Sequence, residues 1–182
     1  MHRVGRDGVQ GLASIKEAGI GEDSWNWLPR IVPGSVIAWV SGEIDVRCHL
    51  VRITEQQGSE TLPKLVHPYL NTITEFSRLT KSQSFVLSVS PAMNSRNRNF
   101  PCEGSLEERR ELTIKVNDLL AQECRNRGVS YCDLWSKVVD SEGAILEGFT
   151  EDGIHLGKGA AHLLYREVVA IVEDLNAPVE EG

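Results

Sequence analysis

Residues 150–156, Thr-Glu-Asp-Gly-Ile-His-Leu, place a carboxylate three positions before an imidazole. In a loop ahead of a helix, Asp152 can turn back toward His155 and accept a hydrogen bond from one ring nitrogen. The other nitrogen then serves as a general base, and Gly153 lets the loop turn tightly. A second interpretation fits the same letters equally well: Asp152 caps the next helix and His155 is a surface residue. The surrounding sequence is needed to choose between them.

Short apolar runs rich in β-branched residues precede this stretch and predict buried strands. They are residues 35–40, 84–90 and 129–133, and residues 1–4 resemble the end of another strand. We expect the strand at residues 36–40 to be buried on both faces of a sheet.

Amphipathic segments lie between these runs and predict helices. They cover residues 9–18, 61–80, 105–128 and 159–175. Ser105 and Glu108 fit a capping box at the start of the third helix, whereas Pro68 predicts a kink or a restart inside the second. Residues 41–49 are expected to form a polar loop, and residues 140–143 a turn.

The predicted order of elements, strand alternating with helix, implies a parallel sheet with helices on both faces. We therefore expect one flavodoxin-like, three-layer α/β/α domain over residues 1–176 and an acidic tail over 177–182. Functional groups in such sheets lie beyond the carboxyl ends of the strands. The loops expected there are residues 5–8, 41–49, 90–104 and the segment leading to His155. This placement favours the catalytic interpretation of Asp152 and His155.

Composition and the absence of certain motifs disfavour several classes of function. The chain has 182 residues and a net charge of −7, whereas a nucleic-acid-binding protein needs clustered Lys and Arg. No apolar run approaches the roughly 20 residues of a membrane span, and no signal-peptide core is present, so we expect a cytoplasmic protein. The four cysteines show no C-x-x-C spacing, which predicts reduced thiols and no metal site. The absence of a P-loop and of G-x-G-x-x-G disfavours a nucleotide-binding domain, and we expect no cofactor.

Taken together, these features resemble the SGNH (GDSL-like) hydrolase superfamily over nearly the whole chain. The block Asp152-Gly153-Ile154-His155 is similar to the family's D-x-x-H block, and Gly42-Glu43-Ile44-Asp45 is similar to its G-x-N-D block. Gly5, with Gly8 as the alternative, resembles the glycine of its second block. The resemblance implies that Asp152 and His155 are catalytic and that Gly5, Gly42 and Asp45 surround the oxyanion and the substrate.

Two departures from the family pattern concern the chemistry itself. No G-D-S block, which carries the family's nucleophilic serine, occurs in the chain, so we expect its first strand and first helix to be missing here. Ile44 occupies the position of the family's asparagine and cannot donate to an oxyanion. Losing one such donor costs about 10²–10³ in rate. Arg47 is long enough to compensate, although a solvated Arg47 is the alternative. His49 could also donate to the oxyanion, with a structural role as its alternative.

Four other residues are candidate nucleophiles. Ser24, in Glu-Asp-Ser, is closest in letters to the missing block but follows no predicted strand. Ser41 and Ser90 end predicted strands, where a hydroxyl more often bonds to the backbone. Cys48 adjoins His49, yet adjacent residues rarely pair as nucleophile and base, which favours a spectator thiol.

The resemblance implies an ester hydrolase acting on a small acyl ester or an acylated glycan, with the serine encoded upstream of Met1. The alternative is a non-catalytic relative that keeps the cleft for binding. In that alternative a missing first strand leaves an apolar sheet edge, which a second copy of the chain or a partner chain is expected to cover.

Overall fold

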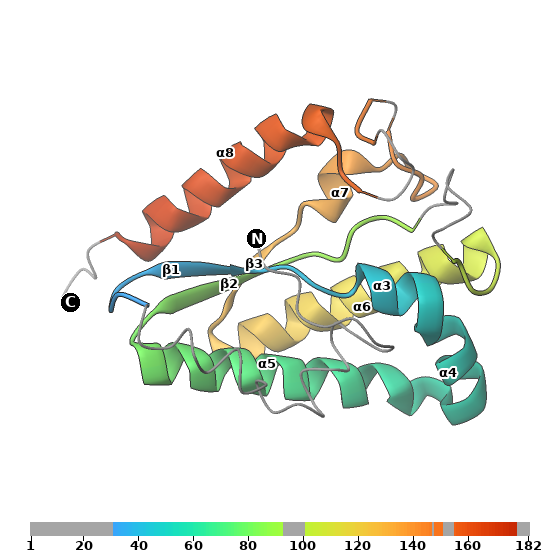
Figure 1. Cartoon of the computed structure of the whole chain (residues 1–182), viewed down its shortest axis with the longest axis horizontal. Coiled ribbons are helices and arrows are strands. Elements are labelled where there is room, and N and C mark those ends of the chain that lie inside the picture. The colour runs from blue at the N-terminus through green and yellow to red at the C-terminus, as the bar shows by residue number, and fades with distance from the viewer. Residues whose placement is uncertain (1–30, 93–100, 147, 151–154, 178–182) are drawn as a thin grey trace.

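The computed structural model describes residues 31–92, 101–146, 148–150 and 155–177. Its sheet contains three parallel strands in the order β1 (Val36–Trp39), β2 (Gln83–Leu87) and β3 (Ser130–Cys132). The strands point the same way and end at one edge, on the right of Figure 1. This parallel sheet flanked by helices confirms the predicted α/β class.

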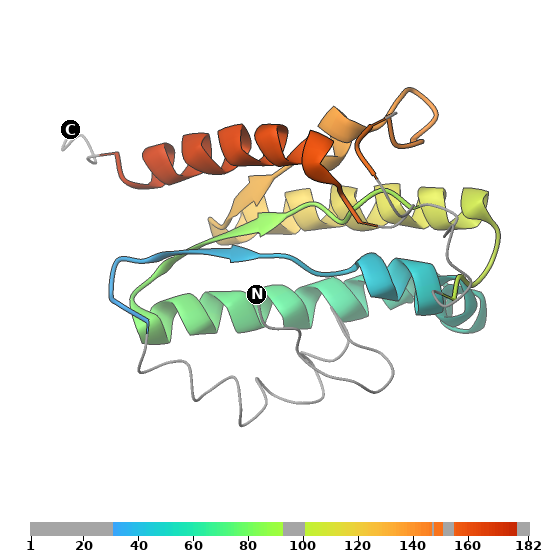
Figure 2. The same ribbon diagram turned by 45° about the horizontal axis from the view of Figure 1, so that its top comes forward.

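Two long helices, α5 (Thr61–Thr80) and α6 (Leu106–Arg127), pack together on one face of the sheet (Figures 1 and 2). Trp39 joins β1 to this layer: its ring meets the Phe76 ring edge-on at 5.2 Å between centroids. Its Nε1 atom also donates to the Ser84 hydroxyl at 2.9 Å. The buried apolar residues of this layer include Val66, Leu70, Ile73, Val86, Val116 and Leu120.

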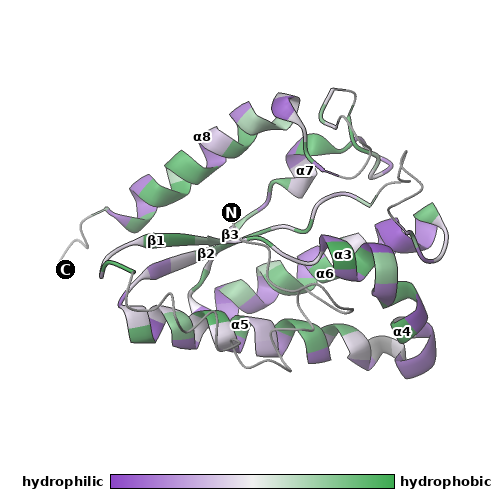
Figure 3. Ribbon diagram, viewed as in Figure 1, coloured by the Kyte–Doolittle hydropathy of each residue, from purple (hydrophilic) through white to green (hydrophobic). Residues whose placement is uncertain are grey.

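The opposite face is covered by the short helix α7 (Trp135–Val138) and by α8 (Lys158–Leu175). Figure 1 shows α8 above the strands and α5 and α6 below them, and Figure 3 shows apolar helix surface turned toward the sheet. The buried core on this side contains Phe85, Leu87, Cys132, Leu134, Val138 and Ala160. None of the described helices is long and apolar enough to cross a membrane.

The strand β1 departs from its prediction. Residues 36–40 were expected to be buried on both faces, but Ala38 is exposed and Val40 is 59% exposed. The reason is that β1 lies at the edge of the described sheet, where β2 is its one partner strand among the described residues. By contrast, β2 lies between two strands, and residues 84–87 are buried.

The bounds of the helices predicted over residues 61–80, 105–128 and 159–175 are confirmed closely. The helix predicted over residues 9–18 and the strand predicted over residues 1–4 lie outside the described residues. Ser105 and Glu108 form the predicted capping box, with the Ser105 hydroxyl accepting from the Glu108 amide and the Glu108 carboxylate accepting from the Ser105 amide. The restart expected at Pro68 is wrong, because α5 continues through it. The carbonyl that loses its donor belongs to Lys64, an exposed residue, so water can satisfy it.

The polar loop predicted over residues 41–49 is also wrong, because the chain is helical from residue 43. A short α3 (Glu43–Asp45), a π-helix η2 (Val46–Leu50), α4 (Val51–Gln57) and a 3₁₀ turn η3 (Gly58–Glu60) follow one another. Val46, Leu50 and Val51 are buried in the same core as α5 and α6. This tertiary packing outweighs the polar composition of the segment.

The backbone that follows β2 is held by the buried side-chain amide of Asn117, on α6. Asn117 accepts from the Val89 amide at 2.7 Å and donates to the Val89 carbonyl at 3.2 Å. Asn117 is itself buried, so this side chain replaces a strand partner for backbone groups that have left the sheet.

Replacing Asn117 with alanine should lower the free energy of unfolding by about 1–3 kcal/mol, because both Val89 backbone groups lose their partners. Urea denaturation of the variant measures this loss. Asn126→Ala is the matched control, since Asn126 is exposed on the same helix and its loss should change stability by less than about 0.5 kcal/mol. Equal stabilities of the two variants would contradict the role given to Asn117.

Candidate active site

The site is built on the segments that leave the carboxyl ends of the strands. β1 runs into Gly42, β2 into residues 88–92, and β3 into Asp133 and α7. The chain then passes through the turn at residues 140–143 and reaches residue 155 just before α8. The three strands are parallel, so these segments gather at one end of the domain (Figure 1), where ligands of such folds bind.

His155 lies at this edge and is exposed, two residues before the N-cap of α8. Backbone contacts on either side hold its position: Thr150 and Leu156 form an antiparallel bridge, and the Gly157 amide donates to the Phe149 carbonyl at 2.8 Å. Asp152 and Gly5 lie outside the described residues. The predicted contact between Asp152 and His155 therefore stays a prediction.

The first turn of α8 lies directly against the backbone at residues 148–149, and this contact fixes where the helix starts. Gly159, in the first turn of α8, touches the segment at Gly148 and Phe149, and a Cβ atom at position 159 would overlap the Gly148 carbonyl oxygen. Only glycine leaves room for this contact. The packing joins the helix that follows His155 to the strand-like segment that precedes it.

Gly42 begins the segment that borders the site after β1. Its φ of 99° lies in the left-handed region, which glycine adopts without strain, and it turns β1 directly into α3. Ile44 is 41% exposed and Asp45 only 1% exposed. The carboxylate of Asp45 thus lies in the protein interior, and its predicted contact with substrate stays a prediction.

Arg47 ties α3 and η2 to the segment before α6. Its Nε atom lies 2.5 Å from the Glu43 carboxylate, and its guanidinium donates to the Pro101 carbonyl at 2.7 Å. The Glu103 amide donates back to the Arg47 carbonyl at 2.7 Å. These contacts shape the edge of the site and show that Arg47 is not a solvated side chain; its predicted oxyanion role stays a prediction.

The serines at the strand ends occupy structural positions. The Ser41 hydroxyl is buried beside the Tyr69 hydroxyl, on the α5 side of the sheet. Ser88, which no sequence pattern singles out, accepts from the Trp135 amide at 2.8 Å and so fixes the start of α7. Ser90 is half-buried at the edge, and Ser24 lies outside the described residues.

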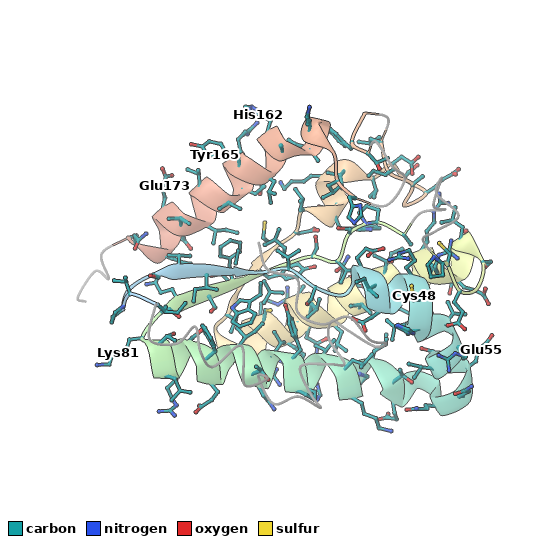
Figure 4. The ribbon with its side chains drawn as sticks, in the orientation of Figure 1. Cys48, Glu55, Lys81, His162, Tyr165 and Glu173 are labelled. Atoms are coloured by element: carbon teal, nitrogen blue, oxygen red, sulfur yellow. The ribbon has the colours of Figure 1, made fainter. Side chains whose placement is uncertain are left out.

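Cys48 has the properties of a spectator thiol. It lies on η2 beyond the end of β1 (Figure 4), and its Sγ atom is 3.3 Å from the Pro101 carbonyl oxygen. Burial raises the pKa of this thiol, and the nearby Arg47 only partly opposes the change. Burial also lowers the pKa of the neighbouring His49. Among the described residues, no three His, Cys, Asp or Glu side chains are grouped to hold a metal ion.

Comparison with known proteins identifies the fold. No protein-family model and no curated protein matches the chain. A GDSL-like lipase from Bacteroides thetaiotaomicron superposes with a TM-score of 0.64 at 16% identity, over 91% of this chain and 72% of that one. A protein from Bacteroides fragilis designated an acylhydrolase gives 0.63 at 14% identity, over 91% and 71%. The chain has an SGNH-like fold.

A third neighbour agrees with the first two. A G-D-S-L family protein from Desulfitobacterium hafniense gives a TM-score of 0.56 at 10% identity, over 89% of this chain and 75% of that one. At such identities the likeness concerns the fold alone. It confirms the resemblance that the D-x-x-H block suggested, while the chemistry of the site has to be argued from this chain's own residues.

Gly159→Ala should destabilise the protein by about 1–3 kcal/mol, although alanine is normally the better helix former. The added methyl group meets a backbone oxygen, which cannot move aside as a flexible side chain does. Thermal unfolding followed by circular dichroism measures the change. Lys158→Ala, one residue earlier and exposed, is the control, and a Gly159→Ala variant as stable as this control would disprove the close contact.

Iodoacetamide at pH 8 should modify Cys48 more slowly than the exposed Cys102. A raised thiol pKa leaves less of the reactive thiolate at a given pH. Cys124 and Cys132 should react more slowly still, since they are buried and their pKa values are raised to about 11. Mass spectrometry of timed digests gives the four rates. A Cys48 that reacted fastest would return to consideration as a nucleophile.

Proposed function

We propose that the protein is an SGNH-type serine ester hydrolase in which His155 is the general base and Asp152 orients it. The observation that carries the proposal is the position of His155. It is exposed at the carboxyl edge of an SGNH-like parallel sheet, on a segment held by backbone hydrogen bonds directly before the last helix.

The proposed reaction has two steps. His155 takes the proton of a serine hydroxyl while the serine oxygen attacks the acyl carbonyl, and it then returns the proton to the leaving alcohol. A water molecule, deprotonated by the same imidazole, then attacks the acyl carbon of the acyl-enzyme. The bond to the serine oxygen breaks, His155 returns the proton to that oxygen, and the acid is released. Asp152 stabilises the imidazolium in both steps, and the Gly5 amide donates to the oxyanion.

The serine belongs on a strand beside β1 in this proposal. A parallel strand added at the outer edge of β1 would end next to Gly42, on the same edge as His155. The printed residues contain no G-D-S block, and in this proposal the added strand carries the serine. The substrate class is a small acyl ester, such as an O-acylated sugar.

A non-catalytic binding protein is the second candidate, and Ile44 is the observation that favours it. Its exposed side chain has no donor at the place where the G-x-N-D pattern has an asparagine. In this version the strand beside β1 comes from a second copy or a partner chain, and the edge binds an acylated ligand without turnover.

His155→Ala should lower the hydrolysis of p-nitrophenyl acetate by about 10²–10⁴-fold in the longest product of the reading frame, because a general base contributes about that much. His162→Ala is the matched control. His162 is exposed on α8 and points away from the sheet (Figure 4), so its loss should leave the rate unchanged.

Two results would separate the candidates. Wild-type turnover in the His155→Ala variant would disprove the role of His155. No hydrolysis by either the printed chain or the longest product of the reading frame would overturn the esterase proposal and leave the binding protein.

A further inference from the structure

A cleft lies at the same end of the domain as the proposed site, between the first turns of α6, helix α7 and the turn at residues 140–143 (Figure 1). Its volume is about 720 Å³, within the range of small-molecule sites, roughly 300–1,000 Å³. Its lining includes Glu107, Arg110, Ile114, Trp135, Asp140 and Glu142. None of them belongs to the proposed catalytic pair.

Trp135 forms a fixed apolar wall of this cleft. Its backbone amide donates to the Ser88 hydroxyl at 2.8 Å, and its ring lies against the turn, so that a Cβ atom added at Gly143 would be 3.5 Å from the ring. The ring is half-buried, so part of it faces solvent. Ile114 extends the apolar surface from α6. An aromatic ring held in this way offers contact area at little cost in conformational entropy.

The charged side chains of the cleft form no hydrogen bonds or ion pairs with one another. Within the described part of the chain, the side chains of Glu107, Glu142 and Arg110 make no hydrogen bond or ion pair, and the Nε atom of Arg110 is buried without an acceptor. Asp140 differs, because its carboxylate accepts from the Glu142 and Ala144 amides and shapes the turn. The cleft therefore presents unpaired acceptors and an unpaired donor beside an aromatic ring.

This combination points to a saccharide. Three carboxylates against one guanidinium disfavour a phosphate or another anion. A cationic peptide would pair with the carboxylates but leave the Arg110 donors unsatisfied. A sugar ring has an apolar C–H face for Trp135 and a rim of hydroxyl groups that both donate and accept, so it can satisfy carboxylates and guanidinium together.

We propose that this cleft binds a neutral saccharide ring, stacked on Trp135 and hydrogen-bonded to Arg110 and Glu142. The turn that lines it leads to His155 through backbone hydrogen bonds from Leu146 to Val138 and from Phe149 to Leu146. The sugar would then be the non-reacting part of an acylated substrate, and this last step alone rests on the proposed function.

The test measures the binding of unacylated cellotetraose, xylotetraose and mannotetraose by saturation-transfer NMR and calorimetry. At least one should bind, and Trp135→Ala should weaken it about tenfold or more. Trp135→Phe should retain most of the affinity. Tyr165→Ala is the matched aromatic control, because Tyr165 is exposed on the far side of α8 (Figure 4), and it should bind as the wild type does.

Glu142→Gln keeps the test decisive if Trp135→Ala fails to fold. Glu142 is exposed and its side chain supports no other residue, and the variant should bind roughly threefold more weakly. Binding to none of the sugars, unchanged binding in both variants, or tighter binding of tetralysine than of any sugar would overturn the inference. His155→Ala should bind sugar normally, so a failed esterase proposal and a failed saccharide site give different results.

Discussion

The parallel pairing of β1, β2 and β3 is the constraint on which the rest of the molecule depends. Parallel neighbours cannot be joined by a tight turn, so each strand must return through a helix. Here α5 and α6 make those returns on one face, and α8 closes the other. The strands then all end at one edge. Residues as distant in sequence as Gly42 and His155 reach the same end of the domain for this reason alone.

Much of this architecture could be predicted, because it depends on local patterns. Apolar runs too short to be helices marked the strands, and helical spacing marked α5, α6 and α8. The segment from Glu43 to Gln57 was missed because its polar residues suggest a loop. Its buried side, Val46, Leu50 and Val51, gains its stability from α6 and the core, and such tertiary packing leaves little trace in composition.

The site was less predictable than the fold, for a different physical reason. A carboxylate three residues before a histidine serves equally well as a helix cap or as half of a catalytic pair, and spacing alone does not distinguish them. The saccharide cleft was missed entirely. Arg110 and Trp135 are 25 positions apart on different elements and belong to no motif; they share a cleft only because α6 and β3 are neighbours in space.

Described residues between Val138 and Gly157 connect the two sites. Backbone hydrogen bonds join Leu146 to Val138, Phe149 to Leu146 and Gly157 to Phe149, and Gly159 packs against the backbone at Gly148. These contacts hold the turn at residues 140–143 and the start of α8 to one another before any ligand binds. A ligand held at Trp135 would therefore lie against a part of the site that is already arranged. Orientation of this kind, established before the ligand arrives, lowers the entropic cost of bringing a reacting group to its base.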